Sequence, residues 1–360
     1  MDRPSDTINA PGRYRMTAAA PALLVEGLIV LAVALFALLL VLCRIELDGG
    51  NSFFYTSEYR RLSEAPYTLS ALRSRSFVPL IAWYVGLGSQ HYAYFSLLVT
   101  FAFLGATALY LRRATGQISL TFVGTILIAT LPITEFGVFA LGWPDQFCYL
   151  MFILTLLLPP SGILFSIAGL LAHELYITLL LCTVFVISRP WHWRLIHLLV
   201  PLGVIWLSKS YFNFPPDGGL GAIPIIQGFL ADPGGQISSQ PFVLGFFSAM
   251  KIFSLLIPYA IYRSVLSGSR DIWSIALPLA LAAGCLILAH DSTRIWGLAL
   301  PAILVSICHL RHHQLLLAAA CVANIFLPSY SVSSAWRVHL DRSFGWIELI
   351  YIAIVQGVAW

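Results

Sequence analysis

The feature that most constrains this chain is a series of long apolar runs that recurs from one end to the other. The first is the 24-residue run from Ala20 to Cys43, and comparable segments return at 93–111, 242–262 and 272–289. A helix needs about 20 apolar residues to cross the hydrocarbon core of a bilayer. Because the runs lack the alternation of barrel strands, they predict membrane-spanning helices.

Composition excludes a soluble protein and argues against a nucleic-acid-binding one. Hydrophobic residues make up 59% of the 360 positions and charged residues only 10%, with a mean hydropathy of +0.85. No ordinary soluble domain tolerates that balance on its surface. The net charge of +4 comes with only two lysines, Lys209 and Lys251, and no basic stripe, so no nucleic-acid partner is expected.

The charged loops predict an orientation. Positive residues in short loops mark the cytoplasmic side of a membrane, and three arginines precede the first apolar run. Residues 1–19 are therefore predicted to be a cytoplasmic tail and residues 20–360 a single transmembrane domain, with outer loops at 44–76 and 213–241. The expected fold is an all-α polytopic protein with about ten or eleven spanning or half-spanning helices.

The same rule assigns the remaining segments. An interfacial helix is expected to open at Phe77, at the end of the first outer loop. The segment 133–146, with its GWPD turn, is expected to lie on the outer side, residues 242–262 are expected to form one span, and residues 346–360 the last helix. The bacterial inner membrane, with the active face toward the periplasm, is the expected location.

The run 162–188 conflicts with a single crossing, because both of its ends are expected inside. Two short helices of about 11 and 14 residues, meeting at His173 and Glu174, resolve the conflict. One long tilted helix with Arg189 outside is the alternative. In the two-helix interpretation, the His173-Glu174 pair lies at a break deep in the membrane or at its outer face.

Acidic residues gather on the predicted outer side. The first outer loop contributes Glu46, Asp48 and Glu58, the GWPD turn contributes Asp145, and the HDSTR stretch at 290–294 follows a span that ends outside. Such a distribution, scattered in sequence but on one face, is what a site built between helix ends requires.

Glu46 and Asp48 form an acidic E-x-D directly after the first span. Acidic groups this close to a bilayer can bind a divalent cation or remove a proton from an incoming hydroxyl. Alternatively, they are solvated surface charges that pair with Arg44, Arg60 or Arg61.

An acidic E-x-D in the first outer loop, just after the first span, resembles the acidic motif that integral-membrane glycosyltransferases of the GT-C superfamily carry at the same place. The resemblance implies a sugar donor linked to polyprenyl phosphate, with Asp48 as the catalytic base and Glu46 as a supporting acid or metal ligand. The segment from Tyr55 to Pro79 is similar to the interfacial helices of that family, and Asp145 fits its second acid. A divalent cation such as Mg²⁺ or Mn²⁺, bound at Glu46 and Asp48, would assist the transfer reaction, but the reaction does not require it.

The stretch AHELYI places two ionisable residues, His173 and Glu174, in an apolar run. Each costs about 2.5–3.5 kcal/mol near the bilayer centre, which argues for pairing or a cavity. They are candidates for substrate binding, or a buried ion pair that fixes a helix contact. A zinc site with His290 and Asp291 is a weaker alternative, because no ligand spacing supports it.

The HDSTR stretch has two compatible interpretations. Asp291 or Ser292 can cap the next helix, and Arg294 can pair with Asp291 at i, i+3. Arg294 can also bind phosphate with its planar fork, while His290 or Asp291 orients the reacting group. Arg75 is a second phosphate-binding candidate, with snorkelling to the interface as its simpler role.

The sequence therefore predicts an inverting glycosyltransferase that moves a sugar from a polyprenyl-phosphate donor onto a lipid-linked glycan, polysaccharide or protein acceptor of the cell envelope. A lipid-linked saccharide transporter or flippase is the rival from another class, and it would need polar groups along a path through the membrane. A polysaccharide polymerase and a metal-dependent lipid hydrolase are further alternatives.

Overall fold

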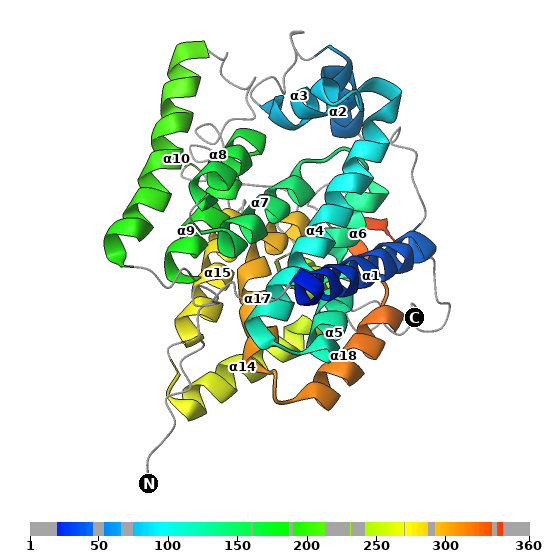
Figure 1. Ribbon diagram of the computed structural model, residues 1–360, viewed down its shortest axis with the longest axis vertical. Coiled ribbons are helices and arrows are strands. Elements are labelled where there is room, and N and C mark those ends of the chain that lie inside the picture. The colour runs from blue at the N-terminus through cyan, green and yellow to red at the C-terminus, as the bar shows by residue number, and fades with distance from the viewer. Residues whose placement is uncertain are drawn as a thin grey trace.

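The computed structural model describes residues 20–45, 54–65, 75–159, 161–186, 190–212, 231, 242–269, 271–286, 292–332 and 337–340. Within these ranges the protein is all-α apart from one antiparallel hairpin, in which Tyr330 pairs with His339. In Figure 1 the helices form one bundle, with α2 and α3 at the top of the view and α14 and α18 at the bottom.

The elements follow the apolar runs. The helices are α1 Ala20–Arg44, α2 Phe54–Glu64, α3 Phe77–Tyr84, η3 Ser89–His91, α4 Tyr92–Thr115, α5 Ile118–Ala129, α6 Pro132–Phe139, α7 Asp145–Leu157, α8 Gly162–Ala172, α9 Tyr176–Val186, α10 Trp191–Phe212, α13 Phe242–Met250, α14 Phe253–Ser267, α15 Asp271–Cys285, α16 Ser292–Trp296, η5 Gly297–Ala299, α17 Leu300–His309 and α18 Gln314–Phe326; the strands are β1 Tyr330–Val332 and β2 Arg337–His339.

Several of these helices are long and apolar enough to cross a membrane. Three pass on length and composition in the described ranges: Leu23–Arg44, Ser89–Thr115 and Ser292–His309. Two bent pairs, α5 with α6 and α13 with α14, pass together, and four further apolar helices are shorter. The leucines of α1 are largely exposed, as expected of a helix that faces lipid. These helices are those of a membrane-embedded protein; the number of spans, predicted as ten or eleven, stays a prediction.

The break predicted at His173 and Glu174 is present. Helix α8 ends at Ala172, His173 takes an extended conformation, and α9 begins at Tyr176. Each half has 11 residues. The predicted helix that opens at Phe77 is also present as α3, packed against α2.

Two predicted segments differ from the structure. Residues 133–146, expected as an outer segment with a turn at GWPD, also contain helix α6, which starts at Pro132, where a fixed φ and a missing N–H favour a first helical position. The single span expected at 242–262 is two helices bent by 88°. Lys251 at the bend has a φ of 45°, in the left-handed region, which a continuous α-helix cannot accommodate. The helix predicted at 346–360 lies outside the described residues.

Three of the segments predicted to lie on the cytoplasmic side are close together at one end of the bundle. Gln314 at the start of α18 donates to Gln117 before α5, with 2.8 Å between Nε2 and Oε1. Ser264 of α14 lies 3.2 Å from His309 of α17. This end therefore gathers the positive residues of three loops or helix ends: Arg112, Arg113, Arg263 and Arg311.

The two bent pairs meet deep in the bundle. The carbonyl of Thr130, freed at the end of α5, accepts a hydrogen bond from Lys251 Nζ at 2.9 Å and another from Asn324 Nδ2 at 3.3 Å. The Asn324 side chain also accepts from the Ile252 N–H. Backbone groups released by a helix break need partners in an apolar setting, and these side chains supply them.

Candidate functional site

Five of the residues nominated from the sequence come together, although they are far apart along the chain. They are Arg75 before α3, Asp145 at the start of α7, His173 and Glu174 between α8 and α9, and Arg294 on α16. Each carboxylate pairs with one arginine, the charges of Arg294 and Arg75 both act on Asp145, and His173 Nδ1 lies 3.5 Å from Glu174 Oε2. We call these five residues the charge cluster.

Arg294 and Asp145 form a bidentate ion pair. The distances are 2.6 Å from Nε to Oδ2 and 3.0 Å from Nη2 to Oδ1. Both side chains are about 85% buried, with relative exposures of 14% and 15%. The guanidinium also lies 3.7 Å from the centre of the Trp143 ring, in a cation–π contact. These contacts hold Arg294 in one orientation.

Local structure explains why these two side chains meet. Asp145 is the first residue of α7, where the positive end of the helix dipole favours a carboxylate. Arg294 lies on the short helix α16, which is anchored on one side because Thr293 Oγ1 accepts the N–H of Val332 in β1 at 2.8 Å. The Tyr149 hydroxyl, one turn into α7, reaches the Arg294 carbonyl at 3.5 Å.

Arg75 and Glu174 form the second pair, which is more open. Arg75 Nε donates to Glu174 Oε2 at 3.0 Å, and Nη2 donates to Oε1. The Arg75 side chain is 15% exposed, whereas that of Glu174 is 43% exposed. Burial raises the pKa of the Glu174 carboxyl and the Arg75 guanidinium lowers it, with a final pKa below the usual value. Glu174 is thus ionised and held by Arg75, but it faces open space.

His173 is the neutral member of the cluster. Its Nδ1 accepts the N–H of Leu175 at 3.1 Å, which places the ring proton on Nε2. Burial lowers the pKa of His173 to about 4, against the opposing charge of Glu174, so the imidazole is neutral at pH 7. The side chain is 5% exposed, and within the described part of the chain Nε2 has no hydrogen-bond partner.

Tyr59 of α2 is also part of the surroundings of the charge cluster. It is 1% exposed and interacts with Arg75, and the charges of all four ion-pair residues act on it. Burial raises the pKa of its hydroxyl, so Tyr59 is a neutral hydrogen-bonding group. Helix α2, which belongs to the predicted first outer loop, therefore covers one side of the cluster.

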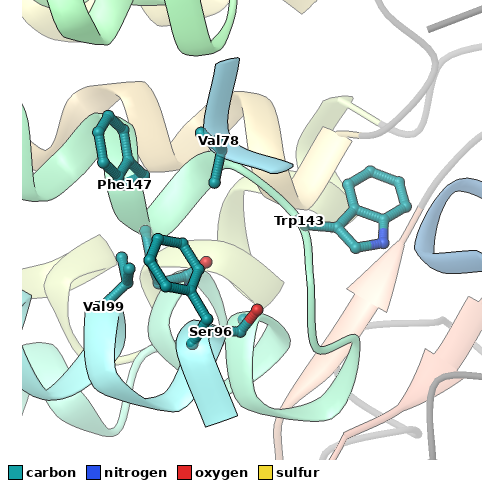
Figure 2. A pocket seen from close by; sticks show the side chains of 8 residues that line it. Val78, Ser96, Val99, Trp143 and Phe147 are labelled. Atoms are coloured by element: carbon teal, nitrogen blue, oxygen red, sulfur yellow. The ribbon is translucent and has the colours of Figure 1, made fainter. Parts of the chain in front are cut away.

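A small pocket adjoins the cluster through Trp143. Its lining comes from α3, α4, α6, α7 and the turn before α7: Val78, Phe95, Ser96, Val99, Gly137, Trp143, Gln146 and Phe147. Figure 2 shows Val78, Phe147 and the α4 side chains Ser96 and Val99 around a common space. It has room for about one water molecule, so it is too small to hold a sugar.

The remaining nominated residues lie outside the described part of the chain. They are Glu46 and Asp48 of the E-x-D, and His290 and Asp291 of HDSTR. Arg294 pairs with Asp145, and its predicted pairing with Asp291 falls on a residue outside the described ranges. The described ranges contain no group of three or more side chains that could hold a metal ion.

Sequence reasoning missed the second polar centre of the molecule. Arg44 Nε pairs with Glu135 Oε1 at 3.0 Å, with relative exposures of 5% and 0%, and Lys251 is 4% exposed. Lys251 and Glu135 each stand alone as a charged residue in an apolar run, and they are the sequence signals of this centre, because buried charges are normally paired. The partners, however, are contributed by distant segments.

Comparison with known proteins gives no match to any protein family, curated protein or solved structure. The assignment of function therefore depends on the charge cluster and on the chemistry of the first outer loop.

Proposed function

We propose that this protein is a glycosyltransferase that moves a sugar from a polyprenyl-phosphate donor to an acceptor hydroxyl at the outer face of a membrane. The observation that carries the proposal is the convergence of two arginines, two carboxylates and a neutral histidine at one place in an apolar bundle. Guanidinium groups suit phosphate because their N–H forks match its oxygens.

The reaction needs little covalent help from the protein. The acceptor oxygen forms a bond to the anomeric carbon, the bond from that carbon to the phosphate oxygen breaks, and the acceptor proton passes to a base. Polyprenyl phosphate leaves with both electrons of the broken bond, and arginine charge stabilises it. Attack opposite the leaving group inverts the anomeric centre.

The geometry of the two ion pairs bears on which carboxylate removes the proton from the acceptor hydroxyl. Both oxygens of Asp145 are engaged by Arg294, so this carboxylate is a poor proton acceptor and is better suited to positioning Arg294. Glu174 is engaged by Arg75 in the resting protein, although this pair is more open. Asp48, with Glu46 beside it, is therefore the preferred base, and Mg²⁺ or Mn²⁺ at this pair would assist the leaving phosphate.

One observation favours an enzyme over a transporter. A transporter needs polar groups that face a path through the membrane. Two of the polar side chains deep in this bundle bond inward instead: Lys251 to Thr130 and Ser329, and Asn324 to Thr130 and Ile252. They brace the two helix breaks, which supports a site that opens on one face.

The test is sugar transfer by membranes that contain the Asp48→Asn variant. Polyprenyl-phosphate-linked hexoses, radiolabelled in the sugar and supplied one at a time, are the donors. We expect at least a 100-fold loss of transfer, within the roughly 10²–10⁴-fold typical of a lost general base. Glu58→Gln is the matched control, since Glu58 is another acid of the same loop and pairs with Arg61. Equal transfer by Asp48→Asn and wild type would rule out Asp48 as the base.

A further inference from the structure

The two arginines of the charge cluster differ in a way that assigns them different tasks. We propose that Arg75 and His173 form an anion site that Glu174 fills in the resting protein, and that an incoming phosphate displaces Glu174. Arg294 is instead a fixed positioning residue. The identity of the ligand, a phosphate monoester or diester, rests on the proposed function; the exchange itself can be measured without transfer.

Arg294 is the less exchangeable of the two. Its carboxylate partner is 15% exposed, its guanidinium stacks on Trp143, and Phe136 lies 5.9 Å away on another side. A ligand would have to separate a buried pair and leave Asp145 without its cation, which is costly in an apolar setting. Arg294 therefore keeps Asp145 when a ligand binds.

Arg75 has the opposite arrangement. Its partner Glu174 is 43% exposed and lies in the break between α8 and α9, outside either helix. When the carboxylate leaves Arg75, it can move into water at little cost. A phosphate presents the same pair of oxygens to the guanidinium fork, so it can take the place that the carboxylate leaves.

His173 supplies the second group of the anion site. The side chain is 95% buried, its Nδ1 is occupied by the Leu175 N–H, and its Nε2–H has no partner among the residues that the structure describes. Nε2 is not among the fully buried atoms without a partner, so this donor keeps access from outside and is available to a ligand that accepts from it. Since Nδ1 also lies 3.5 Å from Glu174 Oε2, His173 and the Arg75 pair are adjacent.

The exchange has a measurable consequence. An internal carboxylate that occupies Arg75 most of the time reduces the apparent affinity for an external anion by the fraction of molecules in which Arg75 is open. If that fraction is about one tenth, removal of the Glu174 charge tightens binding about tenfold. A negative charge elsewhere on the same surface does not have this effect.

The experiment measures binding of inorganic phosphate, farnesyl phosphate and farnesol to the purified full-length protein in detergent by isothermal titration calorimetry. We expect Glu174→Gln to bind farnesyl phosphate about tenfold more tightly than wild type does. Arg75→Gln should lose this binding, and farnesol should not bind. Glu58→Gln is the matched control, because it removes the same charge from α2, the helix that carries Tyr59.

Each outcome of these binding measurements supports or overturns the proposed displacement of Glu174 by phosphate. Binding of farnesyl phosphate by folded Glu174→Gln that is no tighter than by Glu58→Gln would overturn the exchange, as would wild-type affinity in Arg75→Gln. If Glu174→Gln fails to fold, Glu174→Asp, whose shorter side chain reaches Arg75 poorly, should also tighten binding of farnesyl phosphate.

The comparison of ligands identifies the source of the phosphate. Equal affinity for inorganic and farnesyl phosphate assigns the site to free phosphate. If phosphate displaces Glu174 but the protein transfers no sugar, the anion site is supported and the proposed function is refuted. If the protein transfers sugar but phosphate does not displace Glu174, the proposed function is supported and the anion site is refuted.

Discussion

At the scale of single residues, the most consequential feature is the number of charges that the apolar interior holds in pairs. The Arg44–Glu135 pair is almost fully buried, and Arg44 Nη2 also donates to the Leu327 carbonyl at 3.3 Å. Because removal of one partner leaves a buried charge without compensation, Glu135→Gln should destabilise the protein by about 3–5 kcal/mol. Thermal unfolding in detergent measures this.

The matched control for that prediction is the Glu58–Arg61 pair, in which the Glu58 side chain is 15% exposed and the Arg61 side chain 52% exposed. Because the Arg61 guanidinium stays in contact with water when its partner is lost, loss of this pair costs about 1 kcal/mol or less. The double variant Arg44→Met with Glu135→Leu should recover most of the stability lost in Glu135→Gln, since it removes both charges. An unfolding temperature of Glu135→Gln equal to that of Glu58→Gln would contradict the buried pair.

A substitution of Asp145 tests whether this carboxylate positions the Arg294 guanidinium for catalysis. Asp145→Asn keeps the size of the side chain but loses the charge that holds Arg294. The guanidinium should stay on Trp143 with a changed tilt, and misplacement by about 1 Å can cost roughly 100-fold in rate. We expect kcat for sugar transfer to fall by about that factor with a smaller change in KM, and Asp145→Glu to recover part of it. A change in KM alone would show that the pair serves binding.

The residues of the charge cluster could be nominated from the sequence, but their pairing could not. A histidine, acids and arginines at the ends of apolar runs are conspicuous because they are costly there. The pairing of Asp145 with Arg294, 149 positions apart, depends on how α7 and α16 pack, which periodicity does not encode. For Arg294 the local pattern predicts Asp291, which lies outside the described residues, and gives no indication of Asp145.

At the scale of elements, the break between α8 and α9 determines where His173 and Glu174 lie. A Cβ added at Gly169 of α8 would stand 2.4 Å from the buried ring of Tyr176, the first residue of α9. Gly169→Ala should therefore displace the ring and cost about 1–3 kcal/mol, as overpacking does. Gly284→Ala on α15 is the control, because nothing lies within 4 Å of its Cβ position.

Thermal unfolding compares the two glycine variants. Gly284→Ala should be neutral or stabilising by up to about 1 kcal/mol, through better helix propensity. If Gly169→Ala also weakens binding of farnesyl phosphate, the packing of Tyr176 positions the anion site as well. Equal stability of the two variants would show that the contact between α8 and α9 is loose.

Element boundaries were predictable where an apolar run carries its own end signals. Residues 20–43 and 93–111 were predicted as spans, and the helices are α1 Ala20–Arg44 and α4 Tyr92–Thr115, both with arginine in the last turn. The break in 162–188 followed from a conflict between charge and length. The bend at Lys251 was not predictable, because the residues on both sides are apolar and the partners that stabilise it, Thr130 and Asn324, come from α5 and α18.

At the scale of the whole molecule, the basic loops at one end predict an orientation that labelling can test. In a Cys43→Ser background, Gln90→Cys in η3 should react with a membrane-impermeant maleimide in intact cells. His312→Cys, between α17 and α18 at the basic end, should react only after permeabilisation. Both positions are exposed, so access depends on the side of the membrane. The reverse pattern would contradict the positive-inside orientation.

The most direct test of the proposed function uses proteoliposomes that contain the purified protein and a polyprenyl-phosphate-linked hexose radiolabelled in the sugar. With acceptor membranes supplied on the side of η3, label should leave the donor and appear in acceptor glycan, with release of polyprenyl phosphate. Arg75→Gln and Arg294→Gln should abolish this release. Intact donor that moves from one leaflet to the other without cleavage would contradict the account and identify a lipid-linked sugar transporter.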